Sequence, residues 1–378
     1  MRVACQQDQL HRGLSAVSRA VPARSVLPIT QHVLVEADEG RIKLSATDAE
    51  TIAITYTIPA TVAEPGSITM PSRLLSDFVA TLPRDEIELT LAERSRQVSL
   101  SCARNAASIG GMDPDEFPPI PPVEGQGAIQ IEADRLRQAL EHVVFAAATD
   151  DSRPVLTGVD FAISAAGIRL AAADGFRLAV YDLDLPEGDV QEREVIVPAR
   201  ALGELARLLP EANQPVTMTV NAAQTQVLFD LGHATLIANL IQGTFPNYQQ
   251  LIPASSATRT EISVSEFRQE TRLASIFARD GSGIVRLSAT PGVGGAPGRL
   301  LVTARAEEVG NNEGEIDAIV TGEEAKIAFN SRYLIEVLNV IPTDRVAIET
   351  SSPSAPGVLR PVGDDRYVHV VMPMFVQW

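Results

Sequence analysis

Apolar residues recur along this chain with the spacing of helices that bury one face, and one helix pattern is repeated three times. In residues 197–210 (VPARALGELARLLP) the apolar positions follow at i, i+3 and i+7, counted from Leu202. This spacing places them on one side of an α-helix. Residues 70–83 (MPSRLLSDFVATLP) and 329–342 (FNSRYLIEVLNVIP) align with this segment, and each copy ends on a proline, which cannot continue a helix. The pattern predicts the same helix at three equivalent places.

The beginnings of these helices differ in one residue. Pro71 and Pro198 stand at the start of the first two copies, where a proline is compatible with the first helical turn. Asn330 takes this place in the third copy. Asparagine is a good N-cap because its side-chain oxygen can accept a hydrogen bond from a first-turn backbone N–H. We therefore expect all three helices to begin here.

A second amphipathic helix alternates with the first. It is predicted at 8–21, 134–147 and 265–278, and the third copy is the weakest of the three. The leading apolar residues of the two helix types together fall about 65 residues apart, at Leu10, Leu75, Leu136, Leu202, Phe267 and Leu334. The chain is thus built of similar half-units, each a helix followed by other structure.

The segments between the helices have the pattern of strands. Residues 41–58, 216–231 and 345–352 alternate or are rich in β-branched side chains, and Asp, Gly and Asn turns interrupt them. The sequence therefore predicts an α+β fold of three tandem similar domains, each with two helices packed on antiparallel sheets. The predicted domains are 1–125, 126–256 and 257–378.

A repeat of this kind restricts how the domains can assemble. Consecutive similar domains that contact each other head to tail either close into a ring or continue as a filament. The three domains of one chain could close alone, or two chains could close a ring of six domains. The repeat itself does not choose between these arrangements.

The composition places the chain among soluble globular proteins. It has 378 residues, of which 45% are hydrophobic and 21% charged. No apolar run approaches the roughly 18 residues of a membrane span, and no signal peptide is visible at the start. The two cysteines, Cys5 and Cys102, are too few for a disulfide framework. We expect a cytoplasmic protein with no membrane partner.

The net charge of −17 argues against binding nucleic acid by neutralising many phosphates. The placement of the charges qualifies this. Arginines lie in the predicted helices, and Arg73, Arg200 and Arg332 occupy one position in three copies of the same helix. If the helices line the inside of a ring, its hole is lined by arginine while acidic turns face outward. The acidic clusters are at 36–40, 113–117, 182–189 and 307–317.

Several longer motifs identify a family that the chain resembles. They are SRPVLTGV (152–159), ADGFRLAVY (173–181), VPARAL (197–202), FPNYQQLIP (245–253), FNSRYL (329–334) and HVVMPM (369–374). Together they make the whole chain similar to the bacterial DNA polymerase III β subunit, the β sliding clamp.

The resemblance implies a DNA-clamp fold that closes as a head-to-tail dimeric ring around duplex DNA. It implies a non-catalytic processivity factor, without cofactor or metal, that slides along DNA and tethers partners through a peptide-binding groove between domains two and three. The implied partners are double-stranded DNA, held topologically, a second copy of the chain, the replicative DNA polymerase subunit, the clamp loader and other proteins with a clamp-binding motif. A ring that holds DNA by encirclement does not need tight phosphate binding, which agrees with the acidic composition.

The resemblance also assigns residues. The DNA-facing candidates are Arg24, Arg73, Arg153 and Arg200. Positions 154 and 155, where some members have aromatic residues, here carry Pro154 and Val155. The groove candidates are Leu156, Gly175, Phe176, Arg177, Leu178, Pro246, Gln250, Leu251, Asn330, Tyr333, Val371, Met372, Pro373 and Met374.

Three departures from the family pattern lead to further expectations. Phe176 stands where the family often has histidine, and Gln250 where arginine is common, so we expect this groove to prefer more apolar ligand ends. The chain ends MPMFVQW, and we expect Phe375 or Trp378 to border the groove.

The resemblance also places the dimer interface. It should join the edge strand near 104–110 to a helix of the other chain, and its candidate residues are Ala107, Ile276 and Phe277.

Two other classes of protein remain as alternatives. An enzyme finds little support, because the histidines are scattered and the glycine-rich stretch 291–298, which we read as a hairpin loop, lacks a phosphate-loop pattern. The histidines are His11, His32, His142, His233 and His369. A repeat scaffold that binds proteins but not DNA is the second alternative. This alternative would be favoured if the three matched arginines line no common surface.

Overall fold

The computed structural model describes residues 1–378 except 126, 186–189, 211–213, 280, 295 and 307–309. Two of the predicted acidic turns, at 182–189 and 307–317, and the glycine-rich stretch 291–298 therefore lie partly outside the described residues. The chain forms two compact units. The first consists mainly of Met1–Leu136 and Arg200–Ile241, and the second mainly of the rest of the chain.

The predicted helices of both types are confirmed. They are α1 (Gln7–Val17), α2 (Ser72–Thr81), α3 (Ala133–Val143), α4 (Ala199–Leu208), α5 (Val264–Arg279) and α6 (Ser331–Val340). Short 3₁₀ turns, Ser18–Ala20 and Val144–Ala146, extend α1 and α3 toward the predicted ends. No helix in the described part of the chain is long and apolar enough to cross a membrane.

The helix starts show how the sequence sets these boundaries. Pro71 and Pro198 are the last residues of the strands that precede α2 and α4, one position before the first helical turn in which we expected them. Asn330 is the N-cap of α6, as predicted, and its side-chain oxygen accepts a hydrogen bond from the Arg332 N–H at 3.0 Å.

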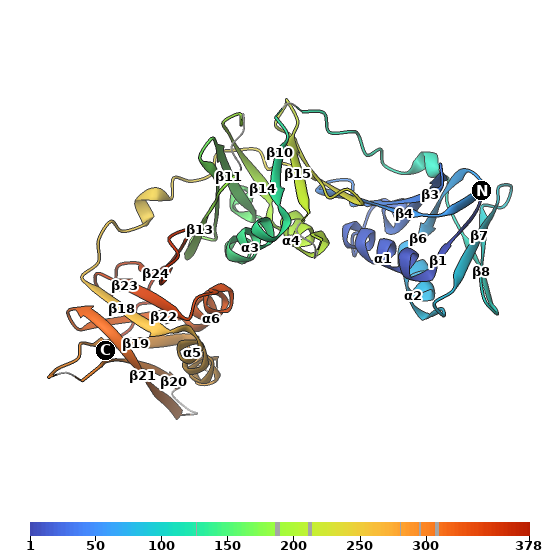
Figure 1. The fold of residues 1–378 in the computed structure, drawn as a ribbon. Helices are drawn as coiled ribbons and strands as arrows, with labels where there is room; N and C mark the ends of the chain where they lie inside the picture. The colour runs from blue at the N-terminus through green and yellow to red at the C-terminus, as the bar shows by residue number, and fades with distance from the viewer. Residues whose placement is uncertain (126, 186–189, 211–213, 280, 295, 307–309) are drawn as a thin grey trace. The chain divides into compact units, whose positions relative to one another are not determined.

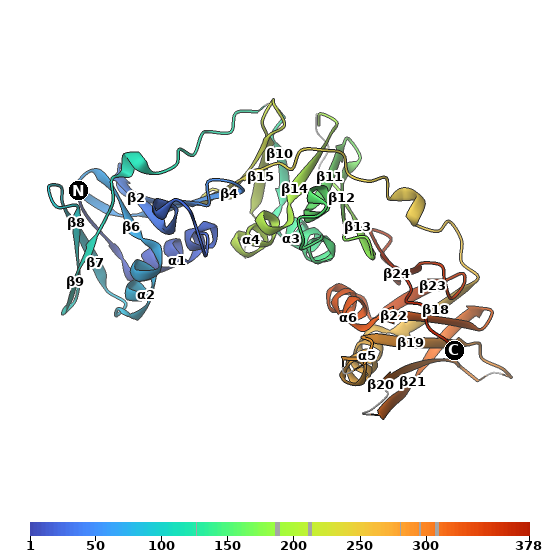
Figure 2. The same cartoon turned by 180° about the vertical axis from the view of Figure 1, so that it is seen from behind.

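The predicted helix anchors lie in the core. Leu10, Leu75, Leu136, Leu202, Phe267 and Leu334 are each at most 1% exposed. Full burial of such a side chain stabilises the fold by about 1.5–3 kcal/mol. In the first unit α1 packs closely on its sheet at Gly13, where a Cβ would lie 2.7 Å from Leu44 Cδ1. In Figures 1 and 2, α1 and α2 lie side by side in the first unit, as do α5 and α6 in the second.

The first unit contains two antiparallel sheets. One has the order β5 (Thr61–Glu64), β1 (Arg2–Gln6), β7 (Glu86–Ala92), β8 (Gln97–Cys102) and β9 (Asn105–Gly110). The other has the order β10 (Ile129–Glu132), β15 (Pro215–Val220), β16 (Gln226–Asp230), β17 (Ala234–Asn239), β4 (Ile52–Pro59), β3 (Arg41–Thr47), β2 (His32–Asp38) and β6 (Gly66–Pro71).

The second unit contains one long antiparallel sheet. Its order begins with β14 (Arg193–Pro198), β11 (Gly158–Ser164), β12 (Gly167–Ala173), β13 (Arg177–Leu183), β25 (Tyr367–Val371), β24 (Gly357–Pro361) and β23 (Arg345–Thr350). It continues with β18 (Thr258–Ser263), β21 (Gly310–Gly322), β20 (Gly298–Ala306), β19 (Ile284–Thr290) and β22 (Ala325–Asn330). β19 and β20 pair as an antiparallel hairpin, and the described residues between them, 291–294, 296 and 297, belong to the predicted loop.

Consecutive repeats are joined by strand pairing, and the two joints are of the same kind. In the first unit β4 pairs with β17, with Ile54 opposite Leu236. In the second unit β13 pairs with β25, with Val180 opposite Val368. The segments that carry β4 and β13 are also the ones whose sequences align, 45–56 with 171–182. The predicted three tandem domains of helices on antiparallel sheets are therefore confirmed, and strand pairing joins each domain to the next within a sheet.

Candidate functional site

All residues expected to form the groove lie in the second unit. Strand pairing brings two of their sequence segments together. Arg177 and Leu178 on β13 face Val371 and Val370 on β25. Just beyond the paired strands, the Met372 N–H donates a hydrogen bond of 2.8 Å to the Phe176 carbonyl oxygen. The C-terminal segment is therefore fixed along the 175–178 segment by backbone contacts.

Arg177 is the centre of a buried set of polar contacts. Its side chain is 5% exposed, and its Nε donates a hydrogen bond of 3.0 Å to Asp174. Its Nη1 pairs with Glu336 on α6, and its Nη2 donates to the Phe145 carbonyl oxygen at 2.5 Å. The guanidinium also lies 4.6 Å from the centroid of the Tyr333 ring. Arg177 thus joins β13 to α6 and holds Tyr333, so its contribution to the site is positional.

The groove candidates divide into buried and exposed side chains. Leu156, Leu178 and Val371 are at most 5% exposed and can serve only as a floor. Phe176 and Met372 are 59% and 40% exposed, a large apolar area to leave in water. The remaining candidates besides Arg177 are Gly175, Pro246, Gln250 and Leu251, which are exposed, and Asn330, Tyr333, Pro373 and Met374, which are half-buried.

The chain after Met372 continues along the second unit. The Met374 N–H donates a hydrogen bond of 2.7 Å to the Ala328 carbonyl oxygen on β22. Beyond this bond Phe375 is 93% and Trp378 52% exposed. The last backbone anchor of the segment therefore lies just before two exposed aromatic side chains.

Arg153, which was expected to face DNA, is fixed to the turn that carries Gly175. Its Nη2 donates a hydrogen bond of 2.7 Å to the Asp174 carbonyl oxygen. Gly175 has a φ of +93°, and a Cβ there would lie 2.7 Å from Arg153 Nη1. A side chain at position 175 would thus be strained and would also displace the guanidinium. The sequence did not reveal that the side chain of an expected DNA contact is bonded to the turn that carries an expected groove residue.

The matched arginines occupy the second residue of three helices. Arg73 on α2, Arg200 on α4 and Arg332 on α6 have side chains 96%, 53% and 73% exposed. Each lies near a carboxylate, at 3.8 Å from Asp77, 3.1 Å from Asp48 and 2.8 Å from Glu336, respectively. The fourth expected DNA contact, Arg24, is also exposed.

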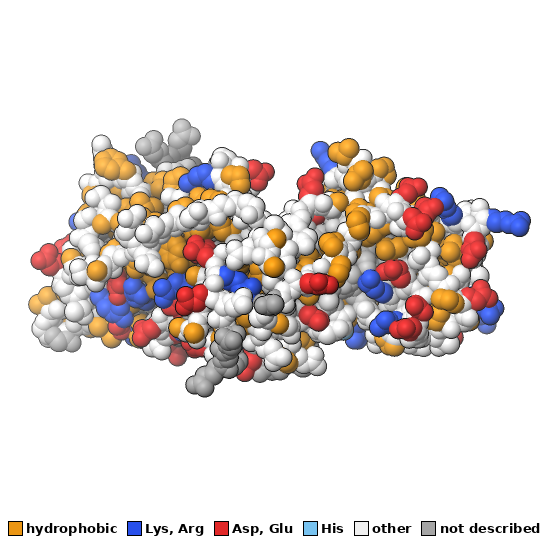
Figure 3. All heavy atoms as spheres, turned by 90° about the horizontal axis from the view of Figure 1, so that it is seen from above, with side chains coloured by type: hydrophobic (Ala, Val, Ile, Leu, Met, Phe, Trp, Pro, Cys, Tyr) orange, Lys and Arg blue, Asp and Glu red, His pale blue; other side chains and the backbone are white. Residues whose placement is uncertain are grey.

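A cation at the start of a helix opposes the helix dipole. The electrostatic cost is about 0.3–1 kcal/mol for an exposed group. An arginine at the same first-turn position in three helices is therefore not explained by helix stability. On the face drawn in Figure 3, acidic and basic side chains both occur among apolar ones.

The expected interface residues lie on an edge strand and on an exposed helix face. Ala107 is on β9, which ends its sheet and pairs only with β8 among the described strands. On α5, Leu273 and Ile276 are 42% and 54% exposed and follow each other at i and i+3. Phe277 is half-buried. Both elements thus present unpaired backbone or apolar side chains to solvent.

Two of the five histidines are part of a buried aromatic cluster. His369 on β25 is fully buried, with its Nδ1 3.2 Å from the Tyr367 hydroxyl and its ring stacked on Phe145. Burial lowers the pKa of His369 to about 3, and burial also lowers the pKa of His142, which packs on Tyr367. Among the described residues no three His, Cys, Asp or Glu side chains are grouped as metal ligands.

Comparisons with known proteins cover the whole chain. The DNA polymerase III beta subunit N-terminal domain matches residues 1–121, its central domain 130–247 and its C-terminal domain 249–375. The beta sliding clamp of Synechococcus elongatus is 33% identical over 376 residues, covering 99% of both chains.

Solved structures agree with this. The DNA polymerase sliding clamp of Bacillus subtilis is 27% identical and superposes with a TM-score of 0.93 over 100% of both chains. A Pseudomonas aeruginosa sliding clamp bound to griselimycin is 28% identical, with a TM-score of 0.89 over 100% of both chains.

Proposed function

Because the chain belongs to the DNA polymerase III beta subunit family, the bacterial sliding clamps, we propose that two copies close head to tail into a ring that encircles duplex DNA. As a member of this family the chain is a DNA polymerase processivity factor. The full-length match to clamps carries this conclusion, and the scaffold and enzyme alternatives gain no support from it. We infer that the ring is not itself catalytic and acts in the cytoplasm.

The strand joints between repeats support a closed ring of two chains. The outer strand of each repeat pairs with the last strand of the next one, as β4 with β17 and β13 with β25. In the first repeat the strand equivalent to β17 and β25 is β9. In the third repeat the strand equivalent to β4 and β13 is the first half of β21, which pairs only with β20 among the described strands. We propose that β9 of one chain pairs with residues 310–316 of the other.

This proposal predicts the mass in solution. A dimer has twice the mass of the 40.4 kDa chain, which light scattering after size exclusion measures. Ala107→Asp on β9 and Ile276→Asp on α5 should each shift the protein to monomer. Val293→Asp places the same charge at an 83% exposed apolar residue outside the interface and should leave the dimer intact. Higher oligomers or a wild-type monomer would contradict the two-chain ring.

Encirclement predicts how DNA is retained. A ring placed on closed circular DNA by a clamp loader should stay on it and should leave linear DNA through the free ends. Arg73→Glu and Arg200→Glu together should shorten retention on circles, because phosphate attraction is replaced by repulsion. Arg94→Glu makes one such charge reversal in an exposed turn of the first unit and should have no effect. Equal retention on circular and linear DNA would rule out encirclement.

We further propose that partners such as the replicative polymerase and the clamp loader dock against Phe176, Met372 and the residues around Tyr333. The support is the exposed apolar area beside a backbone fixed by hydrogen bonds, and methionine adapts easily to different ligands. The Pseudomonas clamp bound to griselimycin shows that a sliding clamp accepts a ligand. Proximity through such docking raises the effective concentration of the polymerase at the DNA.

Peptide binding tests this surface. A synthetic peptide carrying the clamp-binding motif of the polymerase should bind Phe176→Ala about tenfold more weakly than wild type. Val26→Ala removes an apolar side chain that is 98% exposed elsewhere and serves as the control. Deleting residues 375–378 should weaken binding about threefold if Phe375 or Trp378 borders the groove. An unchanged affinity after this deletion would show that residues 375–378 are not part of the site.

A further inference from the structure

A pocket of about 940 Å³ lies in the second unit, between the sheet β14-β11-β12-β13 and the segment 244–249. The expected groove residue Pro246 lines this pocket, whereas the other expected groove residues do not. Phe245 and Tyr248 are 5% and 9% exposed, and their rings meet edge to face. These two aromatic side chains fix the segment on the sheet and form one wall of the pocket.

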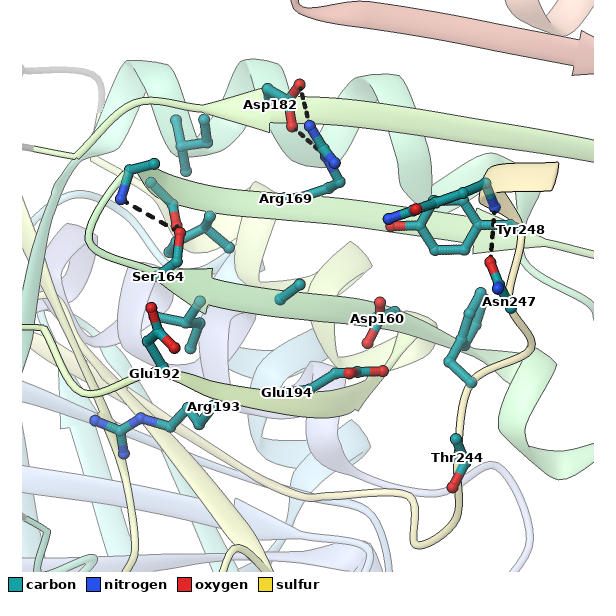
Figure 4. Close-up of a pocket in the computed structure, with 18 of the residues that line it drawn as sticks. Asp160, Ser164, Arg169, Asp182, Glu192, Arg193, Glu194, Thr244, Asn247 and Tyr248 are labelled. Atoms are coloured by element: carbon teal, nitrogen blue, oxygen red, sulfur yellow. Dashed lines mark hydrogen bonds and ion pairs between the residues drawn. The ribbon is translucent and has the colours of Figure 1, made fainter. Parts of the chain in front are cut away.

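The floor of the pocket holds a buried carboxyl group with an unsatisfied oxygen. Asp160 on β11 is 2% exposed, and its Oδ1 has no hydrogen-bond partner in the described part of the chain. Register pairing places Glu194 of β14 diagonally across from it, because Glu194 is opposite Ala162. Figure 4 shows the two carboxyl groups on the same side of their strands and close together. A buried polar oxygen without a partner costs about 1–3 kcal/mol.

The charges around this pair leave it negative. Arg169 on β12 forms an ion pair with Asp182 on β13. Its Nε and Nη2 lie 2.6 and 3.1 Å from the two carboxylate oxygens. Figure 4 shows Arg193 directed away from Asp160. The pocket therefore offers the Asp160 and Glu194 carboxyl groups and an aromatic wall to any ligand that enters, and Asp184 and Glu192 also belong to its lining.

We propose that this pocket binds an alkylammonium or guanidinium group, held between the Asp160 and Glu194 carboxylates and the aromatic rings of the segment 244–249. A cation of this class supplies the N–H donors that Asp160 lacks. Its positive charge offsets part of the negative charge of the carboxylate pair, and aromatic faces attract it further. The same chemistry is available from a free small cation and from an arginine or lysine side chain of another protein.

Protonation gives the site a pH dependence. Burial, reinforced by the nearby Glu194 charge, raises the pKa of Asp160 to about 7. Besides Glu194, the titratable or charged groups that line the pocket with Asp160 are Arg169, Asp182, Asp184, Glu192, Arg193 and Tyr248. Burial followed by the Asp160 charge raises the pKa of Tyr248 to about 12. The ionised form of Asp160 binds the cation, so binding is strong above pH 7 and weakens below it. Affinity should fall about tenfold from pH 8 to pH 6.

Calorimetry on the full chain at pH 8 tests the proposal with two probes. Propylguanidinium represents a free cation, and the capped peptide acetyl-Gly-Arg-Gly-amide carries the same group, with the same single charge, as a side chain. Tighter binding of propylguanidinium identifies a free cation as the source, and tighter binding of the peptide identifies a protein side chain. Equal affinities also support the site, with the guanidinium group alone as the determinant.

Variants separate this site from general attraction to an acidic protein. Asp160→Asn keeps the shape of the side chain and should weaken both probes at least tenfold. Glu194→Gln, at an exposed position, should weaken them about threefold. Glu88→Gln removes an exposed charge on β7 and should change nothing. If Asp160→Asn fails to fold, Glu194→Gln and the wild-type pH dependence still decide.

The proposal is wrong if neither probe binds saturably below about 10 mM, an affinity too weak for a formed site. It is equally wrong if the Asp160→Asn and Glu194→Gln proteins bind as the wild type does. Binding that does not change between pH 6 and pH 8 would also overturn it. None of these outcomes depends on DNA or on dimer formation, so they are independent of the clamp activity.

Discussion

Helices α2 and α6 carry the same pattern of residues, yet the ion pair on α2 is exposed, whereas the equivalent pair on α6 contacts a buried arginine. In α2, Arg73 lies 3.8 Å from Asp77, and the two side chains are 96% and 75% exposed. In α6 the equivalent pair is Arg332 and Glu336, at 2.8 Å, and Glu336 also contacts the buried Arg177. The difference comes from β13, which supplies Arg177. The repeat thus provides the helix, and Arg177 from a neighbouring strand joins one copy to the expected groove residues.

The largest effect should come from removing the buried arginine. Arg177→Met removes the buried guanidinium from Glu336, Asp174 and the Phe145 carbonyl oxygen, which should cost about 3 kcal/mol of unfolding free energy. Arg73→Met in α2 should cost less than about 0.5 kcal/mol, because an exposed ion pair contributes little. Urea unfolding of both variants measures this. Similar losses in the two variants would contradict the distinction between α2 and α6.

The buried His369 beside Arg177 should make the stability of the second unit depend on pH. The pKa of His369 in the folded chain is about 3, below the ordinary value of 6.5. The neutral His369 therefore makes its full contribution to the unfolding free energy above pH 6.5. This contribution is lost as the pH falls, because the unfolded chain takes up a proton that the folded chain excludes. From pH 7 to pH 5 this amounts to about 2 kcal/mol.

The measurement is the unfolding free energy at both pH values in wild type and in His369→Leu, where this part of the decrease should be missing. His233→Gln, on a half-buried ring in the first unit, should keep the wild-type decrease. An identical pH dependence in His369→Leu and wild type would show that His369 does not contribute.

A direct test compares the two equivalent acids. Glu336→Gln should destabilise the chain by about 1.5 kcal/mol, because Arg177 keeps Asp174 but loses one charged partner. Asp77→Asn should stay within about 0.5 kcal/mol of wild type. Calorimetric melting of both proteins distinguishes them, and a larger loss in Asp77→Asn would reverse our interpretation.

The smallest expected effect concerns the start of α6. Asn330→Ala removes the side-chain acceptor of the Arg332 N–H and should cost about 1 kcal/mol. Asn330→Pro copies the residue at the start of α2 and α4, and it fits the backbone because Asn330 has a φ of −62°. Its loss should be no larger than that of Asn330→Ala. Melting temperatures of both variants test whether the cap or the backbone shape matters more.

The sequence predicted the repeated helices well because their buried anchors follow a strong period. Each anchor is a large apolar residue, and the terminating prolines limit where a helix can end. Asn330 was predicted as a cap from its side-chain chemistry alone. The boundaries of the three domains stay a prediction, because strand pairing joins adjacent domains within a sheet.

The sites were harder to predict because they depend on contacts between distant segments. Arg177 was expected in the groove, but no local pattern reveals that it is buried against Glu336 and Phe145. The pocket at Asp160 was missed altogether. A signal was present, since Asp160 interrupts a run of apolar strand residues and Phe245 and Tyr248 are spaced at i and i+3 outside any predicted helix. The roles of these residues depend on burial between segments that are far apart in the sequence, and periodicity cannot show such burial.

The open edge of β9 has a consequence for the isolated chain. Residues 105–110 (NAASIG) contain no charged side chain, and only Arg104 just before them carries one. Unpaired strand backbone without charges is a template for unintended pairing and aggregation. Strong dilution, which should separate the subunits of the proposed dimer, should therefore expose an aggregation-prone strand, and Ser108→Lys should improve the solubility of the separated chains.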